Sequence, residues 1–186
     1  MESGLPVGIR FRPTDYELVG HFLHNKAVMG DQFQTNCISD CPGFYGQNEP
    51  WVIWDLYSGG KVEDDEPLYF FTHRNKLSPS AEFFDQKVGS GTWMEQEEED
   101  VVDRDDNYIG ICRHFQYEGG CDPHQNGAWL MQEYQSLTTY HNNDATDQEL
   151  VLCTLRKNPE KLPPGPPART TPTFTQVMDS EAKRET

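Results

Sequence analysis

The hydrophobic pattern near the start of the chain predicts one amphipathic helix. Its apolar positions recur at helical spacing and are Leu18, Val19, Phe22 and Leu23. Thr14 and Glu17 have the spacing of a capping box, in which each side chain satisfies a backbone N–H group near the helix start. Lys26 and other polar residues fall outside this stripe and are expected to face solvent. We therefore expect a helix that begins after Thr14 and docks on a core.

Farther along, short apolar and aromatic runs bounded by turn-forming residues predict strands. These runs cover residues 66–71, 109–117, 129–134 and 150–153. The glycines before Trp93 indicate a tight entry into a further strand. Residues 27–49 lose periodicity and gather Gly, Asp, Asn and Pro, which predicts a connecting loop with a short helical turn near residues 38–41.

Composition limits the chain to one sizeable domain. The 186 residues are 35% hydrophobic and 12% aromatic, enough for one core. We expect this domain to cover residues 1–157, because residues 158–186 are proline-rich and polar and are expected to form a disordered tail. No run approaches membrane-spanning length and no signal region is visible, so an intracellular protein that does not bind a membrane is expected.

The formal net charge of −16 opposes binding to nucleic acid unless a local basic patch overcomes it, and no such patch is obvious. The five cysteines are odd in number and irregularly spaced, which favours reduced thiols over disulfides. Two groups have zinc-type donors, Cys37 with Cys41 and a set made up of Cys112, His114, Cys121 and His124. Their spacing matches no closed zinc site, so we expect no metal and no cofactor.

Five segments resemble the plant NAC-domain transcription factors. They are LPVGIRFRPTDYELV at the start, against the family's LPPGFRFHPTDEELV, followed by EPLYFF, GSGTW, WLMQEY and LVLC. The resemblance covers residues 5–157 and departs from the opening motif at Val7, Ile9, Arg12 and Tyr16. It implies an α+β fold, a twisted antiparallel β-sheet flanked by a few helices, that forms a two-fold dimer through its N-terminal arm.

The same resemblance implies roles for individual residues. Arg10 and Glu17 occupy the positions whose side chains form reciprocal salt bridges across the family dimer. The alternative is that Arg10 is solvated and Glu17 only caps its helix. Two family arginines that approach DNA correspond to Phe83 and Gln86, which leaves Arg74, Lys76 and Lys87 as the nearby positive charges.

The DNA-contacting strand of the family is the part that this chain does not keep. In the family a KATGxD segment follows the tryptophan and enters the major groove. Here Trp93 is followed by Met94, Glu95, Gln96 and a run of acids to Asp100, so the family's lysine position is Met94. If DNA is bound tightly, Arg113 and the three cations upstream would have to form the contact surface by a pose unlike the family's.

These observations predict a nuclear plant transcription regulator of the NAC type, active as a homodimer or as a heterodimer with other NAC-domain proteins, with weakened or lost binding to double-stranded DNA. The alternative is an interaction protein that does not bind DNA, dimerises with basic relatives and redirects their DNA contacts. A thiol- or metal-dependent enzyme is disfavoured, because no Cys and His pair is marked as nucleophile and base.

Overall fold

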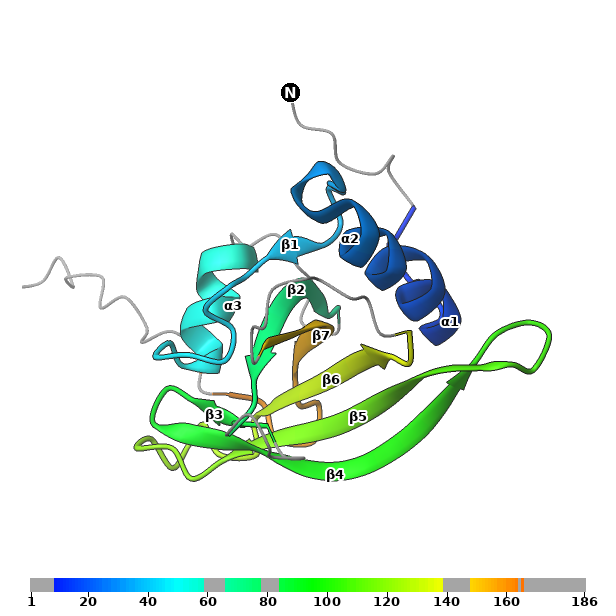
Figure 1. Cartoon of the computed structure of the whole chain (residues 1–186). Helices are drawn as coiled ribbons and strands as arrows, with labels where there is room; N and C mark the ends of the chain where they lie inside the picture. The colour runs from blue at the N-terminus through cyan, green and yellow to red at the C-terminus, as the bar shows by residue number, and fades with distance from the viewer. Residues whose placement is uncertain (1–8, 59–65, 78–83, 139–147, 164, 166–186) are drawn as a thin grey trace, which may run out of the picture.

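A curled seven-stranded sheet organises the protein (Figure 1). The computed structural model describes residues 9–58, 66–77, 84–138, 148–163 and 165. The strand order is β1-β2-β7-β6-β5-β4-β3, and the only parallel pair among these neighbours is β1 with β2. The strands are β1 (Ser39–Asp40), β2 (Leu68–Asn75), β3 (Lys87–Val88), β4 (Gly91–Val102), β5 (Tyr108–Glu118), β6 (Trp129–Ser136) and β7 (Gln148–Lys157). This sheet and its helices confirm the expected α+β class.

Strand alternation divides the apolar side chains between two cores on opposite faces of the sheet. Phe70 of β2 pairs with Cys153 of β7 in one core, and the next residue, Phe71, pairs with Leu152 in the other. Successive side chains of a strand point to opposite faces, so a run without polar interruption indicates a strand covered on both sides. The sheet is therefore the middle layer of the domain.

The N-terminal helix closes one of these cores. It consists of α1 (Asp15–Glu17), a π-helical segment η1 (Leu18–Leu23), α2 (His24–Met29) and a final 3₁₀ turn η2 (Gly30–Gln32). The capping box is confirmed, since the Thr14 N–H donates to Glu17 Oε2 at 2.8 Å and the Glu17 N–H donates to Thr14 Oγ1 at 3.4 Å. Three residues of the predicted stripe are buried, and Phe22 packs against them.

Two expectations about this region were wrong. Lys26 is only 7% exposed, because its ammonium group forms a salt bridge with Asp40 at 2.8 Å. The predicted helical turn near residues 38–41 is instead strand β1, held beside β2 by the Cys41 N–H, which donates to the Phe71 carbonyl at 2.9 Å. Both errors have one cause: local sequence does not reveal pairing with a sheet edge that forms later in the chain.

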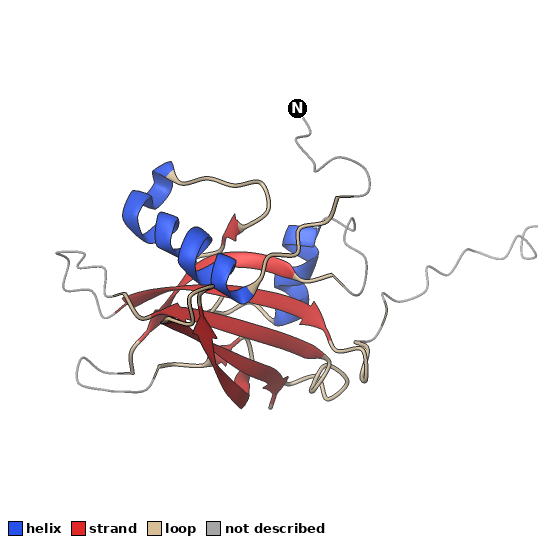
Figure 2. Ribbon diagram, turned by 90° about the vertical axis from the view of Figure 1, so that its right-hand side faces the viewer, coloured by secondary structure: helices blue, strands red, loops and turns tan. Residues whose placement is uncertain are grey.

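Helix α3 (Pro50–Ser58) closes the second core. Ile53 and Trp54 are buried there, and Trp51 packs its ring edge against Tyr117 with centroids 5.9 Å apart, so both tryptophans serve packing. Figure 2 shows the N-terminal helix lying across the strands, with α3 beside them. None of the helices in the described part of the chain is long and apolar enough to cross a membrane.

Asn158 holds the chain to the sheet just after β7. Its backbone N–H donates to the Ala128 carbonyl at 2.9 Å and its side-chain amide donates to the Gly127 carbonyl at 2.7 Å. The chain is thus still bound to the domain one residue after β7. Most of the predicted tail, residues 164 and 166–186, lies outside the described residues, as do residues 5–8 of the predicted dimerisation arm.

Removing the capping hydroxyl tests the helix start. We expect Thr14→Ala to lower the free energy of unfolding by about 1 kcal/mol, because the Glu17 N–H loses the Thr14 hydroxyl and keeps only the Thr14 carbonyl as an acceptor. Thr14→Ser keeps a hydroxyl and is the matched control. We expect it to lower the free energy of unfolding by well under half as much. Urea unfolding followed by circular dichroism measures both, and equal losses for the two variants would contradict the role of the cap.

Candidate nucleic-acid interface

The two longest strands, β4 and β5, form a curved ribbon that extends past the rest of the sheet (Figure 1). We call residues 94–118 the acidic ribbon, because they contain nine carboxylates and two arginines. Pairing is irregular at Gln96, which has no partner on β5, and again after Val101. At the tip, Asp103 Oδ1 accepts hydrogen bonds at 2.9 Å from the backbone N–H groups of Asp105 and Asn107.

Residues 95–100 of this ribbon are exposed on both faces of the strand. Glu98 lies opposite Arg113 and Glu99 lies opposite Cys112, so neighbouring carboxylates point to opposite faces. Neither core covers this part of β4, and the acidic side chains are all in water. The position expected to contact phosphates is therefore a solvated strand with negative charge on each face.

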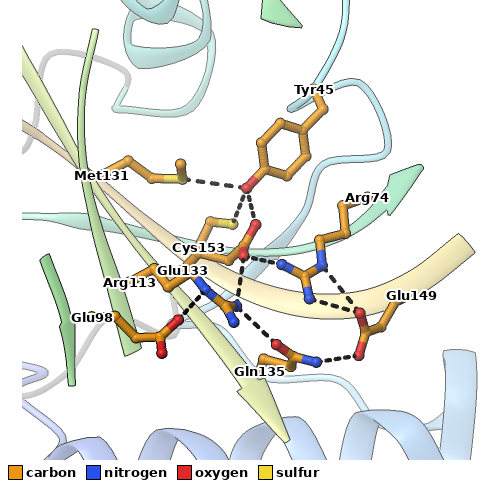
Figure 3. Close-up of polar contacts among 9 residues, drawn as sticks. All are labelled: Tyr45, Arg74, Glu98, Arg113, Met131, Glu133, Gln135, Glu149 and Cys153. Atoms are coloured by element: carbon orange, nitrogen blue, oxygen red, sulfur yellow. Dashed lines mark hydrogen bonds and ion pairs between the residues drawn. The ribbon is translucent and has the colours of Figure 1, made fainter. Parts of the chain in front are cut away.

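Both arginines of the ribbon are held by the protein itself. Arg113 donates from Nε to Glu98 Oε2 at 2.7 Å and from Nη1 to Gln135 Oε1 at 2.8 Å (Figure 3). Arg104 donates to the Tyr16 hydroxyl at 2.7 Å and stacks on its ring, which ties the ribbon tip to the N-terminal helix. Each guanidinium group thus already has at least one donor engaged within the protein.

Arg113 also joins the ribbon to a buried ion pair (Figure 3). Its Nη1 lies 3.8 Å from Glu133 Oε1, and the same carboxylate bonds Arg74 and the Tyr45 hydroxyl. Arg74 is 2% exposed and Glu133 is fully buried, and Arg74 also bonds Glu149 at 2.7 Å. Burial raises the pKa of Glu133 above its usual value, while Arg74 opposes that rise.

The structure thus places Arg74 in the interior and not among exposed cations. Strand alternation could have indicated this burial. Phe70, Thr72 and Arg74 follow one another at intervals of two residues and therefore share one face of β2. Glu133 follows Met131 on β6 in the same way. An inward-facing Arg and an inward-facing Glu could have been matched as a buried pair, but sequence spacing alone does not show that the two strands come close enough.

The other predicted contact residues divide into buried and exposed groups. Trp93 is buried in the core, where it lies parallel to Phe44. The exposed residues are Lys76, Lys87, Met94, Glu95 and Gln96. Lys87 belongs to β3 and pairs with Thr92 at the start of β4. One exposed cation therefore lies beside the first residues of β4. Phe83 lies outside the described residues.

The two predicted dimer residues have partners within the chain. Arg10 Nη1 lies 2.9 Å from Glu66 Oε1, and Glu17 bonds the Thr14 backbone. The hydrogen bonds from the Thr14 N–H and hydroxyl lower the pKa of Glu17, so its carboxylate is ionised and available as a counter-charge. These contacts belong to one isolated chain, and the dimer contact of both residues stays a prediction.

The thiol and imidazole groups do not gather into a metal centre in the described part of the chain, where no group of three or more potential ligands comes together. Cys112 Sγ lies 3.7 Å from His114 Nε2. Burial raises the pKa of Cys112 to about 12, so this residue is a thiol at neutral pH. The thiol form is neither a good nucleophile nor a good metal ligand.

Comparison with known proteins gives a consistent family. Residues 6–136 match the family model described as No apical meristem (NAM) protein. The chain is 30% identical to NAC domain-containing protein 101 of Arabidopsis thaliana over 94% of this chain and 52% of that protein. It is 28% identical to NAC domain-containing protein 105 of the same plant, over 86% of this chain and 53% of the relative. The chain therefore spans about half the length of these curated relatives.

A double-mutant cycle tests the buried pair. We expect Arg74→Met to lower the free energy of unfolding by about 3–5 kcal/mol, because it leaves Glu133 buried without its main counter-charge. Adding Glu133→Met should restore part of the loss. Urea unfolding of both variants is the measurement. The control is Glu98→Gln, which breaks an exposed pair and should lower the free energy of unfolding by about 1 kcal/mol or less. A double variant as unstable as Arg74→Met would show that the two charges are not coupled.

Proposed function

The chain belongs to the NAC-domain (NAM) family, and from that membership we propose that it is a plant transcription regulator that acts in the nucleus as a dimer with weakened intrinsic DNA binding. The observation that carries the DNA part of this proposal is the acidic β4 strand. In the family this strand follows the tryptophan segment into the major groove, and here its exposed positions hold five carboxylates.

The charges of the ribbon support weak binding on physical grounds. Proteins gain most of their affinity for DNA by neutralising phosphates with Lys and Arg, and this gain appears as a steep dependence on salt. The ribbon offers two arginines, and both already bond groups of the protein. Carboxylates held near phosphates add repulsion that counterions screen only beyond about 8 Å at physiological salt. We therefore expect repulsion and not merely missing contacts.

A second function, that of a dimerisation partner without DNA binding, is supported by a contrast between the opening motif and the contact strand. The capping-box and dimerisation positions match the family's opening motif, whereas the contact strand is acidic. A chain of this kind can dimerise with a basic relative and supply only one half of a DNA-binding pair. In that role it would lower or redirect the DNA binding of its partner. DNA titrations of the homodimer and of a mixture with a basic relative separate the two functions.

Restoring the family's contact strand tests the DNA proposal. The variant carries Met94→Lys with Glu95→Ala, Glu97→Gly, Glu98→Thr and Glu99→Asp, and it also frees Arg113 from Glu98. We expect the wild-type homodimer to bind a family-type duplex in the non-specific range of about 10⁻⁴ to 10⁻⁶ M, and the variant to bind at least about tenfold more tightly, or about 1.4 kcal/mol. Fluorescence anisotropy at low and physiological salt measures both.

The control for this experiment removes carboxylates away from the ribbon. Asp55→Asn with Glu160→Gln changes two exposed acids, on α3 and after β7, and should leave DNA affinity nearly unchanged. Raised salt should narrow the gap between the β4 variant and the wild type, because screening weakens the repulsion. If the variant stays folded and dimeric but gains no affinity at any salt, β4 does not face DNA. A nanomolar wild-type complex with a steep salt slope would also refute the proposal.

Charge reversal tests the dimer. We expect Arg10→Glu to weaken dimerisation by at most a few kcal/mol, and added Glu17→Arg to restore part of it. Two controls separate this effect from contacts within the chain: Glu66→Gln removes the partner of Arg10, and Glu17→Gln keeps an acceptor for the Thr14 N–H without the charge. Sedimentation at several concentrations is the measurement. A monomeric wild type, or a double variant with no rescue, would rule out these residues as the interface.

A further inference from the structure

We propose that the open edge of β4 in the acidic ribbon binds a Lys- and Arg-rich extended segment of another protein, which adds to the sheet as a further strand. This inference goes beyond the proposed function, because it requires neither DNA nor a dimer. It rests on two separate properties of the same strand, an unpaired backbone edge and negative charge on both faces.

Among the residues that the structure describes, the backbone edge of β4 opposite β5 has a strand partner only at its start. On one side β4 pairs with β5 along its length, whereas on the other side β3 contributes only Lys87 and Val88, which pair with Thr92 and Gly91. The Trp93 N–H, which donates to the Gln86 carbonyl at 2.9 Å, is the last contact on that side. Across the described ranges, no strand pairs with residues 94–102 there. Such an edge is a template for an added strand.

The pairing geometry favours the part of the edge after Gln96. Gln96 is a bulge residue, and its side chain bonds the Met94 carbonyl at 3.1 Å. From Glu97 to Val101 the register with β5 is unbroken. Five residues extend about 17 Å at about 3.3 Å per residue, enough for one short added strand. We expect the partner's backbone to pair here, while Glu95 contacts one of its side chains before the bulge.

The side chains specify the chemistry of the partner. Glu95, Glu98 and Asp100 lie on the face that carries Phe115, and Glu97 and Glu99 lie on the opposite face. An added strand would project its own side chains to the same two faces, where only cationic groups neutralise these carboxylates. Glu95 and Glu97 form no salt bridge with any residue that the structure describes, so they are available for a basic partner.

A second copy of this chain does not fit the edge. Two β4 strands side by side would set carboxylates opposite carboxylates, which destabilises a strand pair. Charged side chains and bulges also protect strand edges from aggregation. Here the bulge at Gln96 is accompanied by five carboxylates in six positions. These carboxylates attract a cationic strand in addition to protecting the edge from aggregation.

The experiment uses the full chain and two labelled peptides of about nine residues. Both place lysines on both faces of an extended strand. In the first, threonines fill the remaining positions; in the second, prolines replace the threonines, which keeps the charge and removes backbone N–H donors. Fluorescence anisotropy at physiological salt should show binding of the threonine peptide at least about tenfold tighter than of the proline peptide. Hydrogen exchange of β4 amides should slow in the first complex alone.

Two protein variants locate the site. Glu95→Gln with Glu97→Gln should weaken binding of the threonine peptide by at least about fivefold, and the control Asp55→Asn with Glu160→Gln by less than about twofold. Equal affinity for the two peptides would overturn the proposal in favour of a diffuse charge effect. Equal losses in the two variants would place the site elsewhere, and no binding of either peptide at low salt would refute it outright.

Discussion

The buried ion pair between Arg74 and Glu133 is the contact on which the arrangement of the central strands depends. It joins β2 to β6, and Glu149 of β7 bonds the same guanidinium group. An unpaired charge in this position would cost several kcal/mol, so any register that separates the two residues is strongly disfavoured. Their pairing therefore adds to the apolar side chains in favouring one alignment of the three strands.

Arg113 connects this buried pair with the surface of the protein. Its guanidinium group lies between the buried Glu133 and the exposed Glu98, and Gln135 bonds both Arg113 and Glu149. Charges of opposite sign thus alternate from the interior to the ribbon. The arginine that could have served a phosphate is part of this chain of contacts, which links the stability of the sheet to the electrostatic character of its exposed edge.

The two proposals for the acidic ribbon, weak DNA binding and binding of a basic strand, rest on the same charges. Carboxylates on both faces of β4 repel phosphates, and the same carboxylates attract cationic side chains. The rest of the domain does not need this charge, because both cores and the capping box are complete without it. The strand after Trp93 is therefore acidic on a scaffold of the NAC family, and the proposals of DNA repulsion and of a basic partner both follow from the sign of its charge.

The sequence by itself determined the elements that depend on neighbouring residues. Thr14 and Glu17 predicted the helix start, the apolar stripe predicted the buried helix face, and the acidic run after Trp93 indicated that the family's basic contact strand is not kept. Only the tertiary structure decided the fate of residues whose partners are distant in the chain. Lys26 is buried by Asp40, and Arg74 by Glu133 and Glu149. Burial of a charge depends on where its counter-charge lies in space, and local spacing carries no information about that distance.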